Sequence, residues 1–346
     1  MLLIPLVLLL AISLVAVGCA KPAPAPAPEK MEIVVWRYHT PHTPGRLDTA
    51  VEEDWRDFVS TETNGRVRID VYYGNALGFK DADMLRVCGD GIVESFMIYP
   101  GYLGRDDPAI GVANVNTVAL SREEYVEMMP FIRQQLTDLY AKWNIRALTL
   151  WPTPECVVCV IGKEPFTTLE SMAGKKIRCW DKSQAGTFIK VGVPAQIISQ
   201  AEVYLALKTG VLDGCMHYPD GVINLSFYEV CSYIAPMYAC ADTLGFGLNE
   251  DTWQALSPTL QTQMQDIAER FMEKYWASAL DCAIIDEHLR ILEKDYGMTV
   301  LEFSQADYAR FCEAGVENWR ELAQEAGPEA IKVQSALEAE LNRVRG

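Results

Sequence analysis

The stretch "DGCMHY", residues 213–218, places a thiol, a thioether, an imidazole and a phenol directly after a turn signal. Asp-Gly is typical of turns, and the preceding residues 202–207 have the pattern of a short amphipathic helix that ends at a glycine. Met216, His217 and Tyr218 offer apolar contact and hydrogen bonding. We expect them to form one wall of a cleft, with core packing as the alternative for each.

A second candidate for chemistry is Cys156-Val-Val-Cys159, which has the spacing of a redox pair. It lies inside the apolar run "CVVCVIG", which indicates a buried strand and not the exposed helix start that lowers a thiol pKa. Nine cysteines follow Cys19, and neither their odd number nor their spacing fits a disulfide framework. We interpret them as core residues, with redox or metal chemistry as the alternative.

The sequence shows no pattern typical of an active site. Glu94 and Ser95, in the predicted strand segment 91–99, could supply polar contacts in a cleft, but a nucleophile needs a base, and none can be assigned. The sequence contains no recognisable Ser-His-Asp elbow, paired catalytic carboxylates, phosphate-binding loop or set of spaced metal ligands. We predict a protein without catalytic activity, metal or cofactor, with a secreted enzyme as the alternative.

The elements that must position these residues alternate between strand and helix, which favours an α/β fold. One helix begins after Ser121, since Ser121 and Glu124 have the spacing of a capping box, and it continues to about Trp143. The predicted strands are residues 33–36, 67–73, 91–99, 145–151, 156–161 and 176–180.

A long helix is predicted from Ser257-Pro258 to Gly297, because serine suits the N-cap and proline the first helical position. Steps of three and four residues separate its apolar positions, so that one face is expected to be buried along its length. These positions are Leu260, Met264, Ile267, Phe271, Tyr275, Cys282, Ile285, Leu289 and Leu292. The helix is long enough to contact two lobes.

The N-terminal residues 1–18 have the pattern of a signal peptide, an apolar run that stops at "VGC". In this interpretation the chain is exported, cleaved before Cys19 and lipidated on that thiol, and the Pro/Ala-rich segment 19–30 is a semi-rigid tether. The alternative is a membrane-spanning anchor. Either interpretation places the rest outside the cytoplasm, in the periplasm or at the outer face of a membrane.

Composition narrows the class of partner. The 346 residues are 50% hydrophobic and carry a formal net charge of -17, from 30 basic and 47 acidic residues. Such a chain can bury a large core, and its charge argues against a nucleic-acid partner. A small anionic ligand is compatible with the negative net charge, because one internal arginine can hold a carboxylate whatever the charge of the distant surface.

The segment 171–214 resembles the DctP-type solute-binding proteins of TRAP transporters. The resemblance rests on "GKKIR" at 174–178, Val191-Gly192, "EVY" at 202–204 and the motif Thr209-Gly210 to Asp213-Gly214, and it extends over about 33–327. It implies a two-lobed fold like that of type II periplasmic binding proteins, with the long helix spanning both lobes. It also implies capture of a small organic acid by lobe closure and delivery to TRAP membrane permease subunits, as a monomer.

The resemblance also implies where the acid binds. Arg178 matches the arginine that pairs with the ligand carboxylate, and a guanidinium at a strand end offers a rigid fork to a planar acid. His217 matches a ligand-contacting position, and Met216 stands where several relatives have an acidic residue, which argues against a metal beside the ligand. Val158 replaces the second arginine of sialic-acid-binding relatives. A monocarboxylate with an apolar or aromatic body therefore fits best.

Aromatic residues near the expected cleft favour the same ligand. The aromatic residues expected to contact the ligand are Trp36, Tyr38, Trp151, Trp180 and Tyr218, and Glu94 and Ser95 are expected to add polar contacts. Residues 31–155 with 243–283 are expected to form lobe I, and residues 156–242 with 284–346 lobe II. A solute receptor of another transport class is the remaining alternative.

Overall fold

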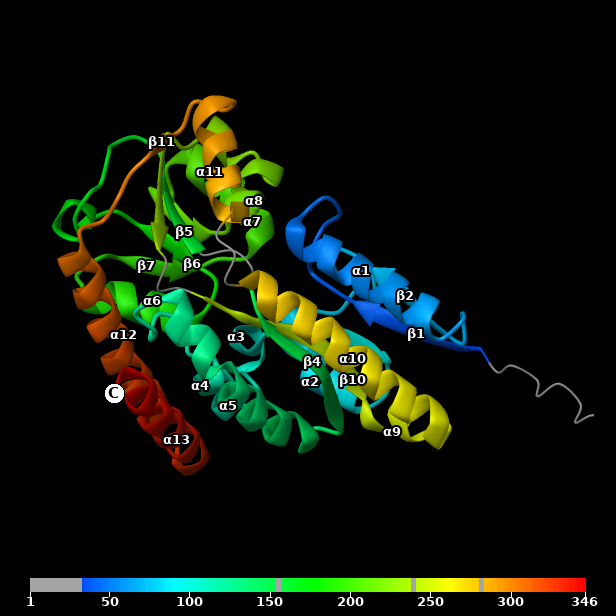
Figure 1. Ribbon diagram of the computed structural model, residues 1–346. Helices are drawn as coiled ribbons and strands as arrows, with labels where there is room; N and C mark the ends of the chain where they lie inside the picture. The colour runs from blue at the N-terminus through cyan, green and yellow to red at the C-terminus, as the bar shows by residue number, and fades with distance from the viewer. Residues whose placement is uncertain (1–32, 154–156, 238–240, 280–282) are drawn as a thin grey trace, which may run out of the picture. The chain divides into compact units, whose positions relative to one another are not determined.

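The computed structural model describes residues 33–153, 157–237, 241–279 and 283–346 (Figure 1). Ile33–Gly346 forms one compact unit of mixed α/β structure, as the alternating pattern predicts. The predicted signal peptide, the predicted lipidation site Cys19 and the predicted tether lie outside the described residues, as do Cys156, Cys240 and Cys282. Within the described part of the chain, no helix combines the length and apolarity needed to cross a bilayer.

Sheet A has the strand order β2-β1-β3-β10-β4. β1 runs parallel to β2 and β3, whereas β10, which comes late in the chain, enters antiparallel between β3 and β4. Its strands are β1 (Val34–His39), β2 (Val67–Tyr72), β3 (Ser95–Ile98), β4 (Ile145–Pro152) and β10 (Thr243–Asn249).

Sheet B has the order β11-β9-β5-β8-β6-β7. β5 pairs antiparallel with both β8 and β9, and β6 pairs parallel with β7 and β8. The strands are β5 (Val157–Ile161), β6 (Ile177–Cys179), β7 (Ala195–Ile197), β8 (Gly214–His217), β9 (Tyr233–Met237) and β11 (Thr299–Val300). The stretch after Asp213-Gly214 is therefore a short strand inside this sheet.

Besides the segment of α10 (Pro258–Ala279) and α11 (Ala283–Lys294), which leads from β10 to β11, two connections join the sheets, β4 to β5 and β9 to β10. They meet where the amide of Thr153 donates a hydrogen bond of 2.9 Å to the carbonyl of Asp242. The chain therefore passes between the two sheets at adjacent points, which is the arrangement that permits hinge motion of two lobes.

Helices cover both sheets (Figure 1). α10 packs on β4 of sheet A, and α11 packs on α8 and β11 of sheet B. α12 packs mainly on α6, and α13 on α4 and α5. The helices are α1 (Leu47–Glu62), α2 (Met84–Gly89), α3 (Pro100–Leu103), α4 (Pro108–Ala113), α5 (Arg122–Ala141), α6 (Lys182–Lys190), α7 (Gln200–Thr209), α8 (Pro219–Asn224), α9 (Glu250–Gln254), α10 (Pro258–Ala279), α11 (Ala283–Lys294), α12 (Gln305–Ala326) and α13 (Pro328–Arg345).

α10 and α11 occupy the long helix predicted from residue 257 to 297, and its continuity through 280–282 lies outside the described residues. The predicted buried face is present on both, from Met264 and Phe271 in α10 to Ile285 and Leu292 in α11. Because α10 contacts sheet A and α11 contacts sheet B, the segment reaches both lobes.

The predicted start of α5 is confirmed in atomic detail. The Ser121 hydroxyl accepts a hydrogen bond from the amide of Glu124 at 3.2 Å. The Glu124 carboxylate accepts at 3.2 Å from the amide of Leu120, one residue before the amide that a standard capping box would use. Local capping chemistry therefore fixes this helix boundary.

The cysteines of the described chain are buried free thiols, namely Cys88, Cys159, Cys179, Cys215, Cys231 and Cys312. Burial raises the pKa of Cys159 well above its usual range, so this thiol stays protonated. This argues against redox chemistry at Cys159 and supports its interpretation as a core residue.

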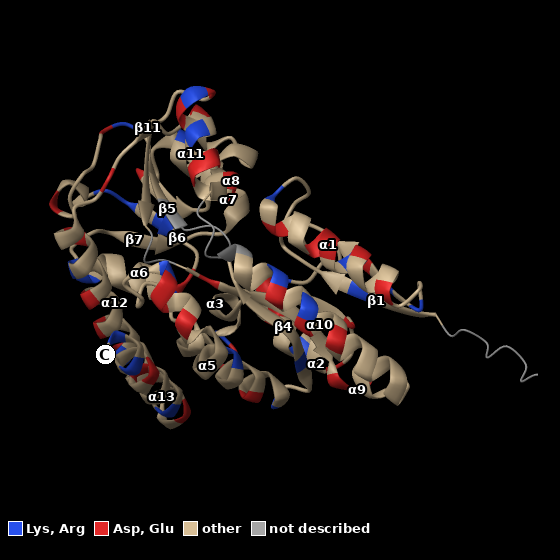
Figure 2. Cartoon of the chain, viewed as in Figure 1, with Lys and Arg blue, Asp and Glu red and all other residues tan. Residues whose placement is uncertain are grey.

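Charged residues of both signs are interspersed along the outer helices, for example on α12 and α13 (Figure 2). Arg320 of α12 pairs with Glu338 of α13, and Arg343 pairs with Glu340 one turn away. Such exposed pairs contribute little to stability, about 0–1 kcal/mol each.

Candidate ligand-binding site

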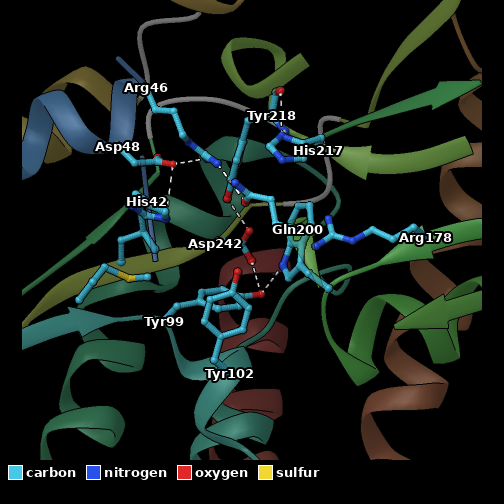
Figure 3. Close-up of a pocket in the computed structure, with 13 residues that line it drawn as sticks. His42, Arg46, Asp48, Tyr99, Tyr102, Arg178, Gln200, His217, Tyr218 and Asp242 are labelled. Carbon is cyan, nitrogen blue, oxygen red and sulfur yellow. Dashed lines mark hydrogen bonds and ion pairs between the residues drawn. The ribbon is translucent and has the colours of Figure 1, made fainter. Parts of the chain in front are cut away.

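A polar pocket opens between the two sheets and is lined by residues from both (Figure 3). Its volume is about 40 Å³, and Tyr102, Arg178, Trp180 and Gln200 also line an outer cleft of about 1250 Å³. The pocket therefore opens into a space large enough for a small organic molecule. Its lining residues are His42, Arg46, Asp48, Met97, Tyr99, Tyr102, Arg178, Trp180, Gln200, His217, Tyr218, Asp242 and Leu244.

Arg178 is the middle residue of β6, and its side chain is buried. Backbone carbonyls orient the guanidinium: Nε donates to Ile198 at 2.9 Å and Nη1 to Met216 at 3.3 Å. The guanidinium also lies over the Trp180 ring, 5.6 Å from its centroid. Among the described residues no carboxylate pairs with Arg178, so its charge is held in place by neutral groups and is available to an anion.

His217 ends β8 and presents one nitrogen to the pocket. The amide of Tyr218 donates to His217 Nδ1 at 2.9 Å, so in the neutral ring the proton lies on Nε2. Burial, and then the charges of Arg46 and Arg178, lower the pKa of His217 well below its usual range. The imidazole is therefore neutral, and Nε2 is a hydrogen-bond donor.

A glycine makes room for the His217 ring. Gly221 lies in α8, directly after the strand, and a Cβ there would stand 2.1 Å from two ring atoms of His217. The ring edge also faces Phe227, with 5.4 Å between centroids. Packing therefore adds to the backbone hydrogen bond in fixing the orientation of the imidazole.

Trp180 and Tyr218 form an aromatic wall, with rings stacked 5.7 Å apart and inclined by 29°. The Tyr218 hydroxyl donates to the Asp242 carboxylate. Met216 differs from its neighbours: its side chain lies fully buried in the core behind the pocket, and its contribution is the carbonyl that holds Arg178. Residues 213–218 thus contribute both to the pocket wall and to the core.

The other residues expected from the sequence do not line the pocket. Trp36, Tyr38 and Trp151 are buried in the core of the sheet A lobe, and the Ser95 hydroxyl donates to the carbonyl of Gly247 at 2.7 Å. Glu94 pairs with Arg37 at 2.6 Å. They lie near strand ends in sequence, but strand periodicity and packing direct these side chains elsewhere.

Several residues that line the pocket were not predicted from the sequence. Arg46 directly precedes α1, and Asp48 lies in its first turn, after the "TPG" turn signal. The Arg-X-Asp pattern at a helix start could have indicated a binding site. Charged residues are common at helix starts, however, because they interact with the helix dipole. Gln200 begins α7, and Asp242 follows β9, where no local pattern marks a site.

Arg46 belongs to a buried charged network. Its Nη2 donates to Asp48 Oδ2 at 2.5 Å and its Nη1 to Gln200 Oε1 at 3.1 Å. Burial alone would raise the pKa of Asp48, but the nearby Arg46 and His42 together outweigh burial and lower this pKa. His42 contacts Glu52 at 2.9 Å, and although burial opposes the imidazolium, Asp48 and Glu52 raise its pKa.

A second network surrounds Tyr99 and Asp242. The Tyr99 hydroxyl donates to Asp181 at 2.5 Å and accepts from Trp180 Nε1 at 2.7 Å. Asp242 accepts from the Tyr218 hydroxyl and from the Asn116 amide group. Burial, and then the nearby Asp181 charge, raise the pKa of Asp242 to about 7.

The chain has two sheets, two adjacent connections between them and a polar pocket between the sheets. These features place it in the class of two-lobed solute-binding proteins. Within that class, the profile of the DctP family, "Bacterial extracellular solute-binding protein, family 7", matches residues 40–326, and the chain belongs to this family.

Two characterised relatives illustrate the family. The chain is 26% identical over 243 residues to the ectoine-binding periplasmic protein TeaA of Halomonas elongata, covering 68% of this chain and 69% of TeaA. It is also 26% identical over 316 residues to the C4-dicarboxylate-binding periplasmic protein DctP of Rhodobacter capsulatus, covering 87% of this chain and 89% of that protein.

Solved structures share the fold. A TRAP periplasmic solute-binding protein of Desulfovibrio salexigens with bound orotic acid superposes with a TM-score of 0.79 at 21% identity, over 90% of this chain and 99% of that chain. DctP7 of Bordetella pertussis, a receptor that binds pyroglutamic acid, superposes with a TM-score of 0.77 at 19% identity, over 88% of this chain and 99% of that chain.

These comparisons confirm the resemblance to TRAP transporter receptors and the two-lobed periplasmic-binding-protein fold. The family consists of extracytoplasmic solute receptors that serve transport, and not of enzymes.

Proposed function

We propose that this receptor binds a small organic acid with one carboxylate and an apolar or aromatic body. The receptor acts as a monomer and delivers the acid to TRAP permease subunits. The observation that carries the proposal is Arg178, a buried guanidinium in the pocket with no carboxylate partner among the described residues. A buried cation of this kind is strongly stabilised by a bidentate ligand carboxylate.

The walls support an apolar or aromatic ligand body. Trp180 and Tyr218 present stacked rings, and Met97 and Leu244 contribute aliphatic surface to the pocket. Orotic and pyroglutamic acids, which two structural relatives bind, each carry one carboxyl group on a ring. A compact acid of this size suits the cleft.

In the proposed mechanism the two lobes close over the acid. We assign residues 31–155 with 243–283 to lobe I and residues 156–242 with 284–346 to lobe II. α13 lies in the second set but packs on α4 and α5 of the first, so the C-terminal helices link the sets. Closure excludes water and strengthens the pairing of Arg178 with the carboxylate.

We also propose that Cys19 is lipidated after cleavage of residues 1–18, so that residues 19–30 tether the receptor to the membrane surface. The intact mass of the protein from membranes checks this: a diacylglyceryl adduct on Cys19 that is lost in Cys19→Ser is expected, and an unmodified N-terminus would contradict it.

The test of the proposed function is a thermal-shift screen of residues 30–346 against aliphatic, aromatic, keto and dicarboxylic acids. An acid at about 100 times its Kd adds about 2.7 kcal/mol to the free energy of unfolding, which raises Tm by several degrees. Arg178→Ala is expected to abolish the shift.

Arg146→Ala is the matched control, because Arg146 also lies on a strand and over a tryptophan, Trp253, but outside the pocket. It is expected to retain the shift. A shift that survives in a folded Arg178→Ala variant would rule out Arg178 as the carboxylate partner, and an absence of any shift would reject an organic-acid ligand.

A further inference from the structure

We propose that the ligand carries, besides its single carboxylate, an uncharged oxygen acceptor, a carbonyl or a hydroxyl, and that Arg46 is the specificity-determining residue that binds this oxygen. The inference rests on the proposed function, because it takes Arg178 as the partner of the carboxylate.

Arg46 and Arg178 reach the pocket from different lobes. Arg46 directly precedes α1 beside sheet A, Arg178 belongs to β6 of sheet B, and Figure 3 shows their guanidinium groups pointing toward the same space. Arg46 is 3% exposed, and its Nε has no hydrogen-bond partner although it is buried. A buried N–H without a partner carries a desolvation cost that a ligand acceptor would remove.

The charges around the two arginines differ. Arg46 pairs with Asp48 at 2.5 Å, and the carboxylate of Asp220 also stabilises its charge. Arg178 is held only by two backbone carbonyls and the Trp180 ring among the described residues. Arg178 therefore lacks the direct carboxylate partner that Arg46 has, and the pocket favours a ligand carboxylate at Arg178.

A second carboxylate beside Arg46 would lie close to Asp48, and repulsion between like charges at a buried site outweighs the gain from an already paired guanidinium. An uncharged oxygen accepts the same hydrogen bond without that repulsion. Two other polar groups of the pocket also favour a ligand oxygen that accepts hydrogen bonds. His217 presents Nε2–H as a donor, whereas Asp242 already accepts hydrogen bonds from Tyr218 and Asn116. The pocket thus offers donors to ligand oxygens.

Calorimetric titration with matched acids tests the inference. The first series has five carbons: pentanoate, 2-oxopentanoate, 4-oxopentanoate and glutarate. The second is aromatic: 4-ethylbenzoate, 4-acetylbenzoate and terephthalate. In the series that binds, we expect an oxo acid to bind at least about tenfold more tightly than its parent acid, and the dicarboxylate to bind more weakly than the oxo acid.

Two variants separate the contributions. Arg46→Gln is expected to weaken binding of the oxo acid at least about tenfold more than binding of the parent acid. Asp48→Asn removes the compensating carboxylate, so the dicarboxylate is expected to gain affinity relative to the oxo acid. Asp54→Asn is the matched control: Asp54 lies on the same helix, pairs with Lys274 at the surface and should leave this ratio unchanged.

Dicarboxylates preferred by the wild type, or an equal loss for parent and oxo acids in Arg46→Gln, would overturn the role of Arg46 while leaving the receptor function intact. If no acid in either series binds, or if binding persists in Arg178→Ala, the proposed function itself fails.

Discussion

Asp242 shows at the scale of one residue how burial sets chemistry. Asp242 is 1% exposed, and the side chains that donate hydrogen bonds to its carboxyl group, Tyr218, Tyr99 and Asn116, are uncharged. Neutral donors offset only part of the cost of burying a charge, and Asp181 adds repulsion. The pKa of Asp242 therefore rises to about 7, from an ordinary value of 3.8.

This shift makes stability depend on pH. Between about pH 4 and pH 7 the folded protein keeps the Asp242 proton while the unfolded chain has lost it, so the stabilisation is complete below about pH 4 and is lost as the pH rises through 7. We expect the stability of the wild type relative to Asp242→Asn to fall over this range by at most about 4 kcal/mol.

Urea unfolding at pH 4.5 and pH 7.5 measures this difference. Asp266→Asn is the control, because the Asp266 side chain is 67% exposed and pairs with Arg270 at the surface. A difference between wild type and Asp242→Asn that stays constant with pH would show that the carboxyl group is ionised throughout.

The residue scale also shows what a sequence can predict about a site. Arg178 and Trp180 lie in the segment 171–214 that carries the family resemblance, and His217 and Tyr218 come shortly after it. The structure brings all four into the pocket, although their roles stay predictions. Arg46 and Asp242 lie outside that segment, and Gln200 lies within it at a position that no motif residue marks. Their proximity depends on how the lobes pack, which local spacing does not encode.

At the scale of elements, β10 shows why some strands escape prediction. Its sequence, "TLGFGLN", contains two glycines, which local propensity disfavours in a strand. A Cβ at Gly245 would lie 2.1 Å from the carbonyl oxygen of Thr149, and one at Gly247 would lie 2.5 Å from the Phe96 ring. Close packing against neighbours on both sides therefore requires glycine there, whereas α5, fixed by its own cap, is predictable.

Gly245→Ala is accordingly expected to be destabilised by at least about 2 kcal/mol, because a backbone carbonyl has to move to admit the methyl group. Gly210→Ala is the comparison. Gly210 ends α7 with φ of 75° and has no neighbour within 4 Å of a Cβ, so only backbone strain of about 1 kcal/mol is expected. Equal losses in denaturant unfolding would show that packing around Gly245 yields easily.

At the scale of the whole molecule, the lobes already share specific contacts. Arg46 reaches Gln200 at 3.1 Å, and the amide of Leu47 donates to Asp220 at 2.8 Å. Tyr99 and Asp181 add a third bond. These polar contacts beside a large cleft suit an equilibrium that a ligand can shift.

We therefore expect a bound acid to reduce the radius of gyration measured by small-angle X-ray scattering. Arg178→Ala is expected to show no reduction at the same acid concentration, and Arg146→Ala to behave like the wild type. A wild-type radius that is unchanged at saturating acid would contradict closure on binding.

The buried thiols have a consequence for a protein that works in an oxidising compartment. Cys88, Cys159, Cys179, Cys215, Cys231 and Cys312 are sheltered in the folded molecule, so an oxidant reaches them only during an opening event. Disulfides or sulfonates found at these positions would therefore be a lasting record of past unfolding. The oxidation state of a purified sample would report its history, independently of how well it binds its ligand.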